Sequence, residues 1–73
     1  MAIDRDKILQ TAQKLVDRRR YDKAIAEYEK IIAHDPRDAR TLLKIGDLQA
    51  RMEAYSLAIA TYDRVAQFYA SQG

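Results

Sequence analysis

The feature that most constrains the fold is an eleven-residue segment that occurs twice, 34 residues apart. Residues 21–31 return as residues 55–65, with five identical positions and four more that keep their chemical type. A fixed period of 20–50 residues is typical of architectures in which one supersecondary unit is repeated and stacked. The period therefore predicts two copies of one unit, packed side by side along the chain.

The spacing of apolar residues predicts a helical chain without strands. We expect four helices, at about 5–18, 22–34, 39–53 and 56–71. Pro36 ends the second helix, because the residue before a proline avoids the helical region. Gly46 lies inside the third helix, where it either permits a close approach of a neighbouring helix or is simply tolerated at a cost of roughly 1 kcal/mol relative to alanine. The expected N-caps are Asp4, Asp22, Asp38 and Ser56.

Length, charge and composition exclude several classes of protein. Seventy-three residues form at most one small domain, which we place at 1–73, with repeats at about 5–38 and 39–72. The chain has no cysteine and one histidine, so it offers no disulfide, thiolate or histidine-based metal site. No stretch approaches the ~20 apolar residues of a membrane span, and the charged N-terminus does not resemble a signal peptide. We expect a cytoplasmic protein without a cofactor.

Two helical hairpins with a period of 34 resemble the tetratricopeptide repeat family. In the first repeat, its pattern of a small residue, an aromatic residue and a proline falls on Ala24, Tyr28 and Pro36. In the second repeat, the small and aromatic positions of the family pattern fall on Gly46, Ala58 and Tyr62. The departures are Ile8, Thr11, Leu42, Gln49 and Ala70. The resemblance implies an all-α fold, with two antiparallel helical hairpins in a right-handed superhelical stack. It also implies protein binding rather than catalysis.

In this family the first helix of each hairpin lines the concave face, which binds partner proteins or peptides. By resemblance, this face contains Leu9, Gln13, Val16, Asp17, Leu43, Lys44, Asp47, Ala50 and Arg51. The alternative is an ordinary solvated face with a few apolar residues at its boundary. Some members bind a carboxylate through Lys and Asn on this face. Leu9 and Gln13 occupy those positions here, and Asp47 adds a like charge, so we do not expect that ligand.

The last helix ends in apolar residues where the first repeat has a polar turn and Pro36. Stacked repeats need about three units and polar capping elements, whereas this chain has two units and no evident cap. Val65, Phe68 and Tyr69 are therefore expected to leave an apolar edge uncovered. A second copy would cover this edge by self-association, or the chain would be part of a longer array.

A nucleic-acid-binding function is the alternative hypothesis. Arg18, Arg19 and Arg20 form a basic run at the end of the first helix, and some helical-repeat proteins bind RNA. A net charge of +2 is too small to favour this function by itself, and a solvated helix end explains the run equally well. Regulation of a motility or signalling machine is a third hypothesis. Catalytic residue sets and glycine-rich phosphate loops are absent from the sequence, so an enzyme is not expected.

Overall fold

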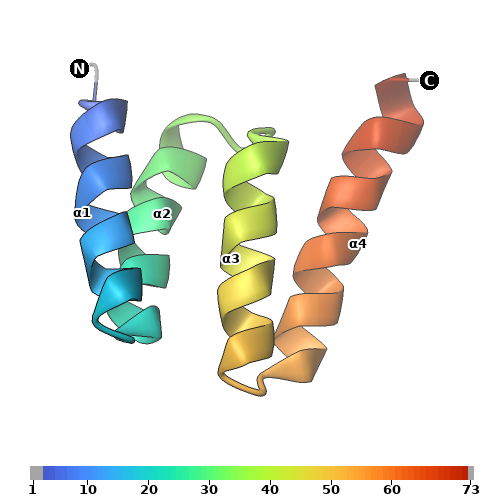
Figure 1. Cartoon of the computed structure of the whole chain (residues 1–73). Coiled ribbons are helices and arrows are strands. Elements are labelled where there is room, and N and C mark those ends of the chain that lie inside the picture. The colour runs from blue at the N-terminus through green and yellow to red at the C-terminus, as the bar shows by residue number, and fades with distance from the viewer. Residues whose placement is uncertain (1–2, 73) are drawn as a thin grey trace.

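The computed structural model describes residues 3–72, and its four helices form two antiparallel hairpins in chain order (Figure 1). Each helix packs on its neighbours in the sequence, α1 on α2, α2 on α3 and α3 on α4. The helices are α1 (Arg5–Asp17), α2 (Tyr21–His34), α3 (Ala39–Arg51) and α4 (Tyr55–Gln72). The predicted all-α hairpin arrangement is confirmed. Met1, Ala2 and Gly73 of the expected domain lie outside the described residues.

The two hairpins begin with the same N-cap, at positions 34 residues apart. The Asp4 side chain accepts a hydrogen bond from the Lys7 backbone amide at 3.0 Å. The Asp38 side chain accepts one from the Thr41 backbone amide at 3.1 Å. Each bond satisfies a backbone N–H that has no partner inside the helix. Both predicted caps are therefore confirmed.

The turns inside the two hairpins are also equivalent. Arg19 has a positive φ of 60°, and Glu53, 34 residues later, has a φ of 62°. The amide of Arg20 donates to the Leu15 carbonyl at 2.8 Å, a bond that closes the C-terminus of α1. This is the Schellman geometry, in which the left-handed residue is usually glycine. Here two charged residues adopt the left-handed conformation.

These turns explain why the caps predicted at Asp22 and Ser56 are wrong. The left-handed residue directs the chain into the next helix after one further residue, so α2 begins at Tyr21 and α4 at Tyr55. Arg20 occupies the N-cap position of α2 without a side-chain hydrogen bond. Asp22 lies in the first turn of α2, where its charge complements the helix dipole.

Small residues allow the helices of each hairpin to approach closely. Ala12 and Ala24 are fully buried in the core between α1 and α2, which they share with Tyr28. In the second hairpin, Gly46 lies directly against the ring of Tyr62. A Cβ atom at Gly46 would lie 2.8 Å from Tyr62 Cε1, which is closer than van der Waals contact allows. The predicted role of Gly46 in close packing is therefore supported by geometry.

Helix α4 is longer than its counterpart α2 and has two distinct faces. Where α2 ends before Pro36, α4 continues through Ala70 to Gln72. Its buried face contains Ala58, Thr61 and Val65, and the Thr61 hydroxyl donates to the Gln49 side-chain oxygen at 2.6 Å. Ile59, which follows Ala58 in the sequence, is 62% exposed. The apolar residues of α4 therefore lie on two faces of the helix.

An ion pair connects α1 with the start of α3. The Arg5 guanidinium lies 2.5 Å from the second carboxylate oxygen of Asp38, whose side chain is almost fully buried. Burial pushes the pKa of Asp38 upward. The hydrogen bond from the Thr41 amide and the contact with Arg5 outweigh burial, so the pKa is lowered from its ordinary value. The charged form of Asp38 is thus stabilised in the folded state.

We predict that Gly46→Ala destabilises the fold when Tyr62 is present and stabilises it when the Tyr62 ring is removed. Alanine gains about 1 kcal/mol of helix propensity, but the clash with the ring costs roughly 1–3 kcal/mol. Chemical denaturation followed by circular dichroism should show a net loss of about 1 kcal/mol. In a Tyr62→Ala background, the same substitution should stabilise by about 1 kcal/mol. If the two substitutions changed the free energy of unfolding additively, this would contradict the contact between Gly46 and the Tyr62 ring.

We also predict a pH-dependent contribution from Asp38. Its folded-state pKa is lowered, so its stabilisation is present above the unfolded-state pKa and is lost as pH falls through the folded-state value. Asp38→Asn keeps a capping side chain but removes the charge, and should cost about 1 kcal/mol at pH 7. Denaturation from pH 7 downward should show this difference shrinking below about pH 4. A stability difference between the wild type and Asp38→Asn that does not change with pH would contradict a lowered pKa of Asp38.

Candidate functional site

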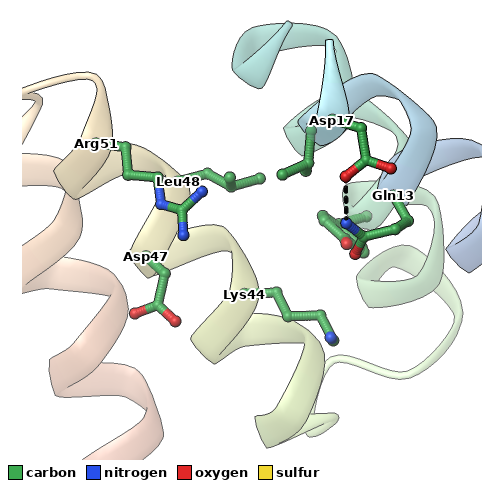
Figure 2. Close-up of a pocket in the computed structure, with 8 residues that line it drawn as sticks. Gln13, Asp17, Lys44, Asp47, Leu48 and Arg51 are labelled. Carbon is green, nitrogen blue, oxygen red and sulfur yellow. Dashed lines mark hydrogen bonds between the residues drawn. The ribbon is translucent and has the colours of Figure 1, made fainter. Parts of the chain in front are cut away.

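A groove of about 330 Å³ lies between α1 and α3 and is open to solvent (Figure 2). Six of the nine residues predicted for the concave face line it. They come from one face of each helix, because positions three and four apart are neighbours on a helix surface. The lining residues are Gln13, Val16 and Asp17 of α1, Tyr28 of α2, and Lys44, Asp47, Leu48 and Arg51 of α3.

The other three predicted residues, Leu9, Leu43 and Ala50, do not line this groove. Leu9 is partly buried and packs against the hydrophobic core. Leu43 is 36% exposed on α3 and contributes no lining to the groove. Tyr28 and Leu48 line the groove instead, although both are almost completely buried. Sequence analysis did not place either residue on the concave face, because a residue at the floor of a groove has the same sequence signal as a core residue.

The groove has an apolar floor and balanced charges at its rim. Lys44 and Leu48 point from α3 toward α1, and Gln13 and Asp17 face them across the groove (Figure 2). The Gln13 amide donates to an Asp17 carboxylate oxygen at 2.9 Å, which fixes both side chains. With Asp47 and Arg51, the rim has two cations and two anions. Such a surface suits a ligand that has both apolar and mixed polar groups.

Asp47 connects the groove to α4. The Tyr62 hydroxyl of α4 donates to Asp47 Oδ1 at 2.5 Å. This hydrogen bond, followed by burial and by the nearby negative charge, raises the pKa of Tyr62 above its ordinary value. One rim carboxylate of the groove is therefore positioned from the second hairpin.

The predicted apolar edge is only partly exposed. Val65 is 4% exposed on the face of α4 that packs on α3, so its assignment to an uncovered edge is wrong. Phe68 is half-buried, and the Arg37 guanidinium lies 5.6 Å from its ring centroid. Tyr69 is 56% exposed, as an edge residue should be. Of the three residues, Tyr69 alone presents most of its side chain to solvent.

The basic run lies in the turn between α1 and α2. Arg18 caps the end of α1, Arg19 holds the left-handed position, and Arg20 precedes α2. All three side chains are exposed. Each residue therefore has a place in the turn geometry, and none of the three lines the groove between α1 and α3.

Among residues 3–72, no group of three or more potential metal-binding side chains lies close together. No helix there has the length and apolar character that crossing a bilayer requires.

Comparison with known proteins gives one family and no individual relative. The family model described as tetratricopeptide repeat matches residues 15–72, which include the end of α1 and all of the other helices. No curated protein and no solved structure matches this chain.

We predict that Asp47→Asn lowers the pKa of Tyr62 toward the ordinary value for tyrosine. The substitution removes the negative charge and weakens the hydrogen bond that raises this pKa. Spectrophotometric titration at alkaline pH, with Tyr62→Phe identifying the signal of this residue, measures the change. An equal titration of Tyr62 in the wild type and in Asp47→Asn would contradict the coupling.

Proposed function

Because the chain belongs to the tetratricopeptide repeat family, we propose that it is a protein-interaction module whose partner binds in the groove between α1 and α3. Repeats of this family generally mediate contacts between proteins and are not catalytic. The observation that carries the proposal is the convergence of six predicted residues from two helices on one open groove.

The lining of the groove defines the chemistry of a suitable partner. Val16 and Leu48 offer an apolar floor for one or two aliphatic or aromatic side chains. The rim alternates Asp17 and Asp47 with Lys44 and Arg51, so a segment with charges of both signs is complementary. A peptide segment bound in this way is positioned by the floor and oriented by the rim, because exposed charge pairs contribute specificity more than affinity.

Nucleic-acid binding through the basic turn has less support than protein binding. Single-stranded nucleic acids are bound by aromatic side chains beside cations, on which the bases stack. Tyr21, the aromatic residue next to the basic turn, is half-buried, and the Arg51 guanidinium lies 5.9 Å from its ring centroid. Arg18, Arg19 and Arg20 therefore have no free aromatic platform beside them in the sequence.

Selection of peptides from a random library, followed by affinity measurements, tests the groove. We expect selected peptides to lose at least about tenfold in affinity, which is 1.4 kcal/mol, against Arg51→Glu or Lys44→Glu. These substitutions reverse the charge at the rim, where both side chains are exposed. Isothermal titration calorimetry with each purified variant gives the dissociation constants.

Lys23→Glu is the matched control, because Lys23 is an exposed lysine of α2 outside the groove lining. It changes the net charge equally and should leave peptide affinity within about twofold of the wild type. Equal losses for Lys23→Glu and Lys44→Glu would indicate a general charge effect and contradict the groove. Tight binding of single-stranded RNA that is lost on substitution of Arg18, Arg19 and Arg20 would favour the alternative function.

A further inference from the structure

Helix α4 has an uncovered stripe whose counterpart in α2 is covered. The stripe consists of Tyr55, Ile59, Tyr62, Ala66 and Tyr69, which recur at intervals of three or four residues and therefore share one side of the helix. Tyr55, Ile59 and Tyr69 are 58%, 62% and 56% exposed. This surface is separate from the groove between α1 and α3.

The counterpart stripe in the first repeat shows what such a surface binds. Tyr21, Ile25 and Tyr28 are the residues 34 positions before Tyr55, Ile59 and Tyr62, and they are identical in type. Tyr28 is 3% exposed and belongs to the core with Ile45 and Leu48 of α3, while Tyr21 and Ile25 pack against that core.

Helix α3 also places a cation on this counterpart stripe. The Arg51 guanidinium lies 5.9 Å from the centroid of the Tyr21 ring, within the range of a cation–π contact. The covering face of α3 thus combines aliphatic residues with an arginine near its C-terminus. The ring of Tyr55, which corresponds to Tyr21, is 58% exposed.

A second copy joined head to tail does not supply the same covering face. In such an assembly, α1 of the next copy would take the place on α4 that α3 takes on α2. Leu48 and Thr41 of α3 are buried, but the corresponding residues of α1 are Lys14 and Lys7, and both are exposed. The face that α1 would present is therefore basic where the covering face of α3 is apolar.

A second copy joined stripe to stripe brings like charges together. Antiparallel pairing that matches Ile59 with Ala66 places the two-fold axis between Tyr62 and Asp63. Asp63 follows Tyr62 in the sequence, and Asp47 accepts the hydrogen bond of the Tyr62 hydroxyl. Both aspartates are exposed, so four carboxylates would gather at the axis. Like charges placed together in an interface oppose association.

We propose that the uncovered stripe of α4 binds an amphipathic helix of a partner protein, in the way that α3 binds α2. The partner helix would present aliphatic residues with the spacing of Leu42, Ile45 and Leu48, which are buried in α3. A cation would contact the ring of Tyr55. Further cations of the partner helix would face Asp47 and Asp63, which are exposed at the edges of the stripe.

The α3 sequence itself is the probe for this site. A synthetic peptide with the sequence of residues 38–54 is titrated into the isotope-labelled full chain and followed by NMR, because a short isolated helix binds weakly. We expect saturable shift changes along the α4 stripe. Ile59→Lys should weaken binding at least about tenfold, and a peptide with Ile45→Glu should not bind.

Leu57→Lys is the matched control, because Leu57 is 59% exposed on the same helix but lies off the stripe. It should bind the peptide within about twofold of the wild type, and both variants should keep the helical circular dichroism of the wild type. Absence of peptide binding, or equal losses for Ile59→Lys and Leu57→Lys, would overturn the proposal. Concentration-dependent self-association that Ile59→Lys abolishes would assign the stripe to a second copy instead.

Discussion

The fold depends on the close approach of the two helices in each hairpin. Ala12 and Ala24 have no exposed surface, and Gly46 has no room for a methyl group beside Tyr62. These small residues bring the backbones together, and the larger Tyr28 and Tyr62 fill the space beside them. The orientation of α1 relative to α2, and of α3 relative to α4, follows from this alternation of small and large side chains. The groove between α1 and α3 exists because both hairpins have the same geometry.

Much of this arrangement was predictable, because the determinants of the repeat are local. The 34-residue period, the caps at Asp4 and Asp38, and the helix stop at Pro36 each depend on a few adjacent residues. The turns were less predictable, since the sequence places Arg19 and Glu53 where glycine is usual. With no glycine to mark the turn, the acidic and hydroxyl residues that follow it resembled N-caps.

The residues of α4 were harder to assign, because burial there depends on which face α3 contacts. Thr61 is buried although it is polar, since its hydroxyl finds a partner in Gln49. Ile59 is exposed although it is strongly apolar. A hydrophobic pattern reports how apolar a position is and contains no information on which neighbour is present. The groove residues were found more easily, because the family pattern specifies the concave side of α1 and α3.

Because α4 continues through Ala70, coverage of its outer stripe differs from coverage of α2 in how it depends on concentration. In the first repeat, Pro36 turns the chain back and α3 covers α2 as part of folding, independently of concentration. Among residues 3–72, α4 packs on α3 alone, so binding of the proposed partner helix to the outer stripe would follow mass action. A ligand that binds only the folded chain stabilises it by RT ln(1 + [L]/Kd). With such a partner, the melting temperature of this small protein would measure how much of the partner is present.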